Sequence, residues 1–257
     1  MDHLSRVKQE FSRQAEHFAT SAAITDQEQT DRFIEALGTG DLGTALDVAC
    51  GPGIITAPLA LRAREVVAFD LTPEMLSKAR QRCGNAGVSN VEFKEGSATE
   101  LPFADRSFDT VVTRLSMHHF DDPRRVLDEI WRVLKPGGSF VVADVISSEL
   151  PEKSALHNAI EVLRDPSHIR MLPGSEVLSL IGEVGFTVVS TLTWDKPREF
   201  EEWAAIVDDP MRVAPLRVIA EALVRLGEDA GMGLSLVDGR LVFFHRWYLA
   251  ATRKPAR

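Results

Sequence analysis

The chain lacks several features that would assign it to a specialised class of protein. Its 257 residues include only two cysteines, Cys50 and Cys83, which do not have the spacing of metal ligands. No apolar run approaches the ~18 residues that a membrane span needs. The first ten residues are charged and lack the apolar segment of a secretory signal. We therefore expect a cytoplasmic protein without a membrane span.

Positive charge is also scarce. The formal net charge is −9 and the sequence pI is near 5.3, and the short tail carries the basic pair Arg253-Lys254. Non-specific binding to nucleic acid depends on basic patches, so we expect no nucleic-acid partner. The hydrophobic content of 44% and the charged content of 26% are those of an ordinary globular enzyme.

A glycine turn between two apolar segments is the most informative stretch that is present. Leu46-Asp47-Val48-Ala49-Cys50-Gly51-Pro52-Gly53 places two glycines after a buried strand, where the backbone can bend sharply and approach a ligand. The helix expected next offers free N–H groups to an anion. A second apolar strand ends in Asp70, whose carboxylate can hold a ribose diol. This order of elements predicts a nucleoside site.

The type of nucleoside follows from another absence. A dinucleotide fingerprint requires G-x-G-x-x-G/A, and counting from Gly51 places Thr56 at the third position. The missing glycine would have allowed close packing of helix and strand beside a pyrophosphate. An NAD-dependent oxidoreductase is therefore the less favoured alternative.

Strands and helices alternate along the first 147 residues, which predicts a parallel sheet covered by helices on both faces. The expected strands are 44–49, 65–70, 90–95, 108–115, 139–145, 186–194, 234–237 and 241–252. The expected helices are 4–18, 26–37, 54–62, 73–86, 123–135, 152–163, 176–184 and 200–226, the last one interrupted near Pro210. Asp238-Gly239 is a strong hairpin signal and makes the final strand antiparallel.

The motifs together resemble one family. The form D-x-[GA]-x-G-x-G from Asp47 resembles motif I of the class I S-adenosylmethionine (SAM) methyltransferases. The stretch 91–145 is similar to the ubiquinone/menaquinone-biosynthesis C-methyltransferases (methyltransferase type 11), and Arg164-Asp165-Pro166-Ser167-His168 resembles a narrower bacterial subgroup.

This resemblance implies a Rossmann-like, doubly wound α/β fold with seven strands, the last one antiparallel. It implies a helical lid over 1–40, a SAM-binding core over 41–147, and a region 148–257 that adds helical cap insertions and completes the sheet. The implied activity is methyl transfer from SAM to a carbon, nitrogen or oxygen of a ring or quinone-like small molecule. A homodimer is a candidate assembly.

Site residues are implied position by position. The expected cofactor contacts are Ala49, Gly51, Gly53, Asp70, Leu71, Met75, Ser97, Ala98, Arg114, Leu115, Phe18 and Gln14. Ser97 replaces the acid that usually accepts a hydrogen bond from the adenine amino group, which predicts weaker cofactor binding by ~1 kcal/mol or somewhat more.

Two histidines follow the fourth strand at the edge where such sheets bind ligands. His119 is the candidate general base because alternation along an extended segment groups it with Leu115 and Met117. His118 is the second candidate. Both could instead merely line the loop. Adjacent side chains diverge, so we expect no metal site at this pair.

The polar cluster around Arg164 and His168 has two open interpretations. It either binds the substrate or forms a structural ion-pair network. The sequence also leaves open a SAM-binding protein that transfers no methyl group, since the cofactor motifs would be the same. A nucleic-acid methyltransferase is disfavoured because Thr113-Arg114-Leu115-Ser116 stands where such enzymes carry Asn/Asp-Pro-Pro-Tyr/Phe.

Overall fold

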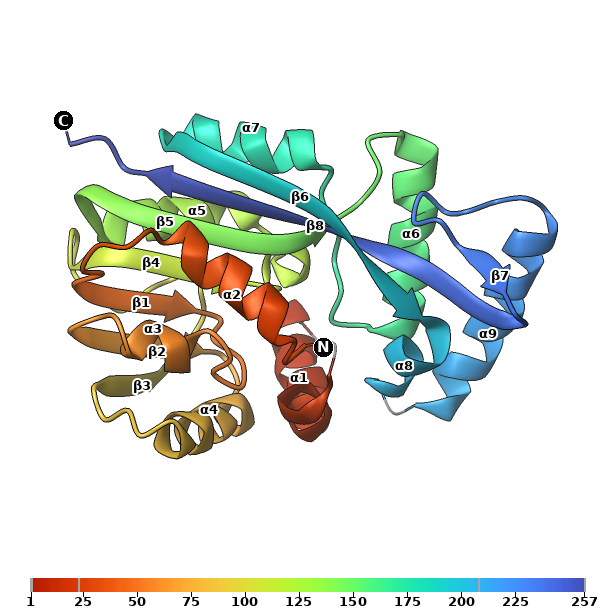
Figure 1. Ribbon diagram of the computed structural model, residues 1–257, viewed down its shortest axis with the longest axis horizontal. Helices are drawn as coiled ribbons and strands as arrows, with labels where there is room; N and C mark the ends of the chain where they lie inside the picture. The colour runs from red at the N-terminus through yellow and green to blue at the C-terminus, as the bar shows by residue number, and fades with distance from the viewer. Residues whose placement is uncertain (1, 23, 208, 257) are drawn as a thin grey trace.

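One mixed sheet runs through the computed structural model, which describes residues 2–22, 24–207 and 209–256 (Figure 1). Its strands are β1 (Thr44–Val48), β2 (Glu65–Asp70), β3 (Val91–Glu95), β4 (Phe108–Arg114), β5 (Leu134–Ile146), β6 (Thr187–Glu199), β7 (Ser235–Val237) and β8 (Arg240–Arg253). They lie in the order β3-β2-β1-β4-β5-β8-β6, with β7 paired to β8 alone.

Strand direction confirms the expected fold class. Strands β1 to β5 pair in parallel, and β8 is antiparallel to both β5 and β6. The order reverses beside β1, which lies between β2 and β4. Ligands bind outside the carboxyl ends of the strands at such a switch point.

The helices of the described residues agree with most of the expected ranges. They are α1 (His3–Thr20), α2 (Gln27–Ala36), α3 (Thr56–Ala60), α4 (Pro73–Asn85), α5 (Pro123–Val133), α6 (Pro151–Arg164), α7 (Gly174–Val184), α8 (Phe200–Ala205) and α9 (Pro210–Arg225), with a 3₁₀ turn η1 (Met117–His119). Asp122 caps α5, accepting from the N–H of Arg125 at 2.9 Å.

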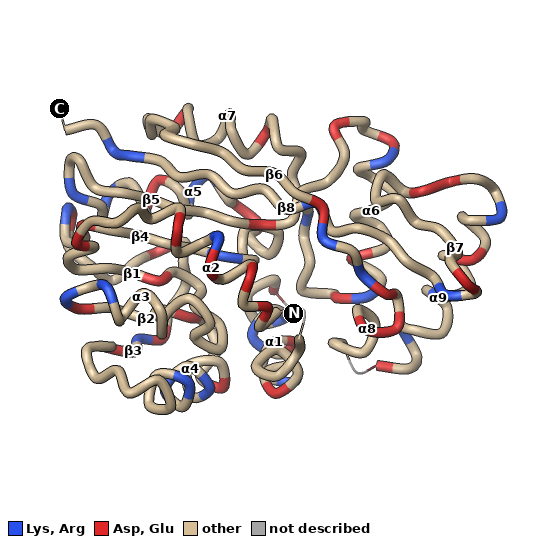
Figure 2. Tube along the Cα trace, in the orientation of Figure 1, with Lys and Arg blue, Asp and Glu red and all other residues tan. Residues whose placement is uncertain are grey.

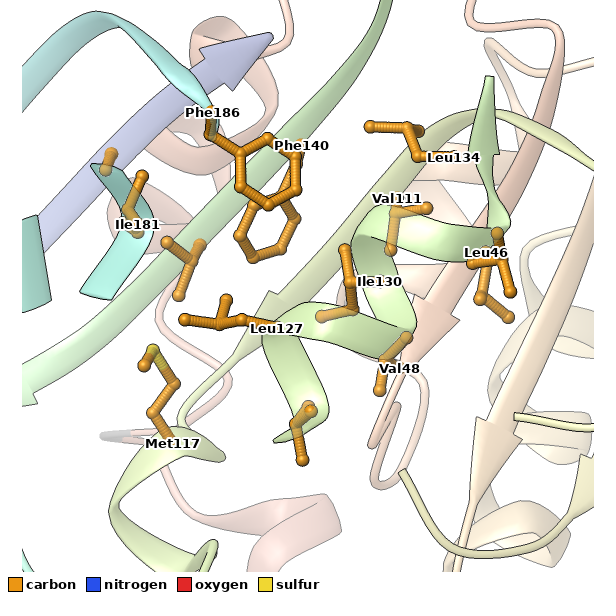
Figure 3. Packing of buried hydrophobic residues seen from close by; sticks show 14 of the residues in the cluster. Leu46, Val48, Val111, Met117, Leu127, Ile130, Leu134, Phe140, Ile181 and Phe186 are labelled. Carbon is orange, nitrogen blue, oxygen red and sulfur yellow. The ribbon is translucent and has the colours of Figure 1, made fainter. Parts of the chain in front are cut away.

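Period-two alternation in the strands divides the core between the two faces of the sheet. On one face, Leu46, Val111 and Phe140 pack with Ile130 of α5 and Ile181 of α7 (Figure 3). On the other face, Phe33 of α2 and Leu59 of α3 pack with the strand residues Ala45, Val112 and Val141. Because both faces are covered, the inner strands are apolar on both sides.

Strands β6 and β8 extend beyond the other strands and carry a second lobe, the cap, which contains β7, α6, α8 and α9 (Figure 1). Strand β8 pairs with β5 only from Arg246 onward, whereas its pairing with β6 begins at Val242. The projecting ends bear β7, and Phe243 packs there with Trp203 of α8, Leu216 of α9 and Ile160 of α6. The cap is therefore anchored on the sheet's own strands.

Two expected element boundaries are wrong, and one residue does not act as its position suggests. Helix α3 covers only Thr56–Ala60, because the glycine turn extends through Ile55. Thr72 precedes Pro73 at the start of α4, the position of a helix cap, but its side chain makes no capping bond and interacts with Asp70 instead. Strand β5 begins at Leu134 rather than after the glycines, because Leu134 pairs with Phe108 before a bulge shifts the register.

Charged residues of both signs are interspersed along the chain, without a large basic region (Figure 2). This distribution agrees with the acidic net charge of −9. Among the described helices, none is long and apolar enough to cross a membrane.

Candidate active site

A cavity opens at the carboxyl ends of β1, β2 and β4, beneath α1. Of the expected cofactor contacts, the cavity is lined by Ala49, Gly51, Asp70, Leu71, Met75, Ser97, Ala98, Arg114, Leu115 and Phe18. The candidate base His119 lines the same cavity. Segments from 18 to 119 thus meet at one edge because parallel strands end there together.

The glycine turn is built from left-handed backbone. Ala49, Gly51 and Gly53 have φ angles of 54°, 52° and 77°. A Cβ added to Gly51 would meet no described atom within 4 Å, whereas one added to Gly53 would lie 2.9 Å from the Cα of Ala79. Gly51 therefore leaves room on the cavity side, and Gly53 allows α4 to approach. Gly53 does not itself line the cavity.

Asp70 holds this turn and also faces the cavity. Its Oδ2 accepts from the N–H of Gly51 at 2.8 Å, and its Oδ1 accepts from the N–H of Thr72 at 2.9 Å. Burial raises the pKa of Asp70, while these hydrogen bonds oppose the rise. Each carboxylate oxygen retains acceptor capacity for a further donor such as a ribose hydroxyl.

Asp47 and Arg114 place buried charges of opposite sign beside the turn. Asp47 accepts from the hydroxyl of Thr56 at 2.6 Å, and burial raises its pKa to about 7. Arg114 donates to the carbonyl of Ile24 at 2.9 Å, but its Nε has no hydrogen-bond partner among the described residues. Burial lowers the pKa of Arg114 to about 10, so it stays charged. An orphaned cationic donor beside a carboxylate fits the carboxylate and amino groups of a bound amino acid.

The adenine side of the cavity is apolar except at Ser97. Met75 is buried, and Leu71 and Ala98 also line this part. The hydroxyl of Ser97 lies 2.7 Å from that of Thr99. Ser97 thus offers a neutral acceptor where the resemblance leads one to expect an acid.

Helix α1, part of the expected lid, supplies a wall of the cavity, of which sequence reasoning assigned Phe18 but not Leu4, Val7 or Phe11. Leu4, Val7, Phe11 and Phe18 line the cavity, and the intervals of three, four and seven residues place them on one helix face. Surface ion pairs join α1 to the core, including Lys8 with Glu95 at 2.6 Å. The apolar spacing of α1 was visible in the sequence and could have identified this wall.

The buried carboxylate of Asp144, on β5, fixes the turn that carries both histidines. Its Oδ2 accepts from the N–H groups of Ser116 and Met117 at 3.1 and 2.7 Å. Its Oδ1 lies 2.6 Å from Nδ1 of His118. Burial alone would lower the pKa of His118, but the charge and hydrogen bond of Asp144 outweigh burial and raise this pKa above 6.5. Sequence reasoning missed Asp144, which lies in an otherwise apolar strand.

His119 has the opposite electrostatic environment. Burial, followed by the adjacent charge of His118, lowers the pKa of His119 to about 4. Its Nδ1 lies 3.0 Å from the carbonyl oxygen of Ser167, which can only accept. Nδ1 therefore carries the proton of the neutral ring, and Nε2 is the unprotonated nitrogen.

Several expected site residues do not line the cavity. Gln14 is buried and donates to Glu10 at 3.3 Å. His118 pairs with Asp144 behind the cavity wall. Arg164 binds Glu161 at 2.9 Å and lies 4.7 Å from the ring centroid of Trp203, and His168 pairs with Asn158 at 2.9 Å. Of the two interpretations of this cluster, the placement favours a structural polar network.

Within the described ranges, one group of potential metal ligands comes together: His157, Glu161 and His245, all buried, with ligand atoms within 4.8 Å of one another. Arg198 donates to Nδ1 of His245 at 3.0 Å, which places the ring proton on Nε2, facing Glu161 at 3.4 Å. A metal ion would have to displace that proton beside a guanidinium. The hydrogen bonds of His245 therefore disfavour metal ligation at that residue, while both ring nitrogens of His157 are buried without a hydrogen-bond partner among the described residues.

The fold and the site together define a class I SAM-binding α/β protein. A family model described as "Methyltransferase domain" matches residues 46–142. YafE of Escherichia coli is 39% identical over 145 residues, covering 56% of this chain and 70% of YafE. The uncharacterized methyltransferase YcgJ of Bacillus subtilis is 31% identical over 193 residues, covering 75% of this chain and 76% of YcgJ.

Structural similarity agrees with the sequence matches. The crystal structure of YcgJ has a TM-score of 0.81 and 27% identity, covering 89% of this chain and 99% of that one.

The demethylmenaquinone methyltransferase of Clavibacter sepedonicus is 42% identical over 106 residues, or 41% of this chain and 42% of that enzyme. The chain therefore belongs to the SAM-dependent methyltransferases that the domain model and YcgJ represent, and SAM is its cofactor. The NAD-dependent alternative is thereby set aside.

Replacing Asp70 by alanine should weaken SAM binding by about 10- to 150-fold, as expected for the loss of ~1.5–3 kcal/mol from a charged acceptor that also holds the turn. Isothermal titration calorimetry measures the change. Asp105→Ala, which removes a carboxylate far from the turn, is the control. Unchanged SAM affinity in Asp70→Ala would contradict the assignment.

SAM affinity should fall about eightfold between pH 7.5 and pH 6 because Asp47, with a pKa of about 7, takes up a proton over this range. Because its pKa is raised, the Asp47 carboxyl of the ligand-free protein keeps its proton up to about pH 7. The positive charge of SAM favours the loss of that proton, so SAM binds more weakly at a pH at which Asp47 is protonated. Asp47→Asn should abolish the dependence. An equal slope in both proteins would assign it to another group.

Ser97→Asp should strengthen SAM binding severalfold by supplying a charged acceptor for the adenine amino group. Ser97→Asn, of nearly equal size but neutral, separates charge from shape. Weaker binding of the Asp variant than of the wild type in the same titration would mean that this part of the pocket is built differently.

Proposed function

We propose that the protein transfers the methyl group of SAM to a small acceptor bearing a ring, with His119 as general base. One observation carries this proposal: Asp70, the proposed nucleoside contact, and His119 line the same cavity, and apolar side chains of α1 form one of its walls. Both partners of a methyl transfer can therefore lie in one cavity. Alignment in such a space is the main requirement of this reaction.

The roles of the residues follow from their positions. SAM supplies a methyl group made electrophilic by its sulfonium. Asp70 would hold the ribose, Met75 and Ala98 the adenine, and Arg114 with Asp47 the charged amino-acid end. His119 would accept the proton that the acceptor loses.

The lowered pKa of His119 defines what kind of base it can be. At a pKa of about 4 the ring stays neutral throughout pH 6 to 9, so its Nε2 is always available. The same pKa makes it too weak to ionise a phenol or an acidic carbon in advance. His119 is suited to take a proton whose release accompanies methyl transfer.

The walls beyond the nucleoside end support an apolar ring as acceptor. Leu4, Val7 and Phe11 line this part, together with Phe120 and the edge of His119. Phe11 and His119 are in edge-to-face contact, with ring centroids 4.8 Å apart. The name of the demethylmenaquinone methyltransferase relative agrees with a quinone-like acceptor. The two free, buried thiols support a reducing, cytoplasmic location.

A direct test uses SAM labelled in the methyl group with a panel of hydroquinones, phenols and aromatic N-heterocycles. Transfer of label to at least one of these acceptor classes is expected. Binding of SAM by the protein without transfer to any of them would favour the alternative of a SAM-binding protein that transfers no methyl group.

Replacing His119 by alanine should lower kcat by ~10²-fold or more while SAM affinity stays within about threefold. His119→Asn is the matched variant, because its amide can still donate to Ser167 but has no basic nitrogen. Single-turnover methyl transfer with the acceptor from the panel measures both. Wild-type rates in His119→Asn across pH 6 to 9 would show that alignment alone carries catalysis.

A further inference from the structure

The loop after α6 contacts His119 from outside the cavity. Nδ1 of His119 lies 3.0 Å from the carbonyl oxygen and 3.3 Å from the hydroxyl of Ser167. Asp165 Oδ1 in turn accepts from the hydroxyl of Ser167 at 2.6 Å and from its N–H at 2.9 Å. Ser167 is fully buried and Asp165 is 2% exposed. A carboxylate, a serine and an imidazole thus form one buried series.

A second contact joins the same loop to the turn that carries His119. The carbonyl of His118 accepts from the N–H groups of Ile169 and Arg170 at 2.9 and 3.2 Å. Asp144 holds the opposite side of η1 through the N–H groups of Ser116 and Met117. The turn η1 is therefore held by hydrogen bonds to β5 on one side and to the loop after α6 on the other.

We infer that Asp165 and Ser167 are positioning residues that fix the tautomer and orientation of His119, so that its unprotonated Nε2 is presented to the acceptor. This inference rests on the proposed function, in which His119 accepts the proton. Neither residue lines the cavity, so both act through His119.

The charges around His119 fit this role. Asp165 and Asp144 favour a positive charge on the ring, whereas His118 opposes it. His168 is also close, with ring centroids 6.3 Å apart, but its own pKa is lowered to about 3, chiefly by burial, so it stays neutral. A proton received by His119 would therefore lie beside two fixed carboxylates.

This arrangement gives a different use to the stretch from Arg164 to His168. The residues at its two ends are directed away from the cavity, Arg164 to Glu161 and the neutral His168 to Asn158. The two residues between them that act on His119 are the small Ser167 and the buried Asp165. The cap thus supports the chemistry from behind, without touching the acceptor.

The tautomer can be observed without any acceptor. Long-range ¹H–¹⁵N spectra of protein labelled at histidine distinguish the two neutral tautomers, and His119→Asn assigns the signal among the seven histidines. The wild type at pH 7.5 should show a neutral ring with the proton on Nδ1. A ring with the proton on Nε2, or a charged ring, would overturn the inference whatever the catalytic result.

Variants of Asp165 and Ser167 then test whether these residues position His119. Asp165→Ala should mix the tautomers and lower kcat by about 10- to 50-fold, while acceptor KM and SAM affinity stay within about threefold. Ser167→Ala, which keeps the carbonyl, should have a smaller effect in the same direction. Asp165→Asn, which keeps an acceptor oxygen, should restore the tautomer.

Asp195→Ala is the control, since it removes a carboxylate from a surface ion pair with Arg246. Thermal unfolding and SAM titration identify a variant that has lost its fold, in which case Ser167→Ala decides. An unchanged tautomer and rate in Asp165→Ala would contradict the inference. Full activity of His119→Asn would instead refute the general base while leaving the tautomer result to stand on its own.

Discussion

The buried carboxylate of Asp144 is the interaction on which the site depends. Its two oxygens receive three backbone N–H groups and one imidazole within 3.1 Å. Such a group is costly to bury unless every acceptor position is used, and here they are used to tie β5 to the turn after β4. The same carboxylate raises the pKa of His118, whereas burial and then the positive charge of His118 lower the pKa of His119. The pKa values of two adjacent histidines are thereby shifted in opposite directions.

Two of the five described non-glycine residues with positive φ lie at the same edge of the sheet. Ala49 follows β1 and Leu115 follows β4, and both have positive φ angles, 54° and 53°, without being glycine. Each residue lines the cavity at the point where its strand turns away. Such strain persists only where the surroundings enforce it, and here neighbouring parallel strands fix both positions. At Ala49 and Leu115 the strained backbone therefore coincides with the candidate site.

Most of the fold could be predicted from the sequence because its signals are local. Alternation of strands and helices, the glycine turn and the Asp238-Gly239 hairpin each depend on a few neighbouring residues, and the structure confirms the sheet they predict. The wrong expectations concern boundaries at which tertiary contacts prevail. Thr72 has the sequence of a helix cap, but its side chain faces Asp70 across the turn. Leu134 lies next to a glycine stop, but pairing with Phe108 draws it into the strand.

The candidate site was less predictable, because its key contacts join distant segments. Asp144 and His118 are 26 residues apart, and Ser167 and His119 are 48 apart. Nothing in the local pattern of either member indicates its partner. The stretch Arg164–His168 was recognisable as polar, and its charged residues were the natural candidates for substrate contact. In the structure these polar side chains are instead paired with one another or with neighbours in the cap. The residue of this stretch that contacts the candidate base is Ser167, whose small side chain lets its own carbonyl approach the imidazole.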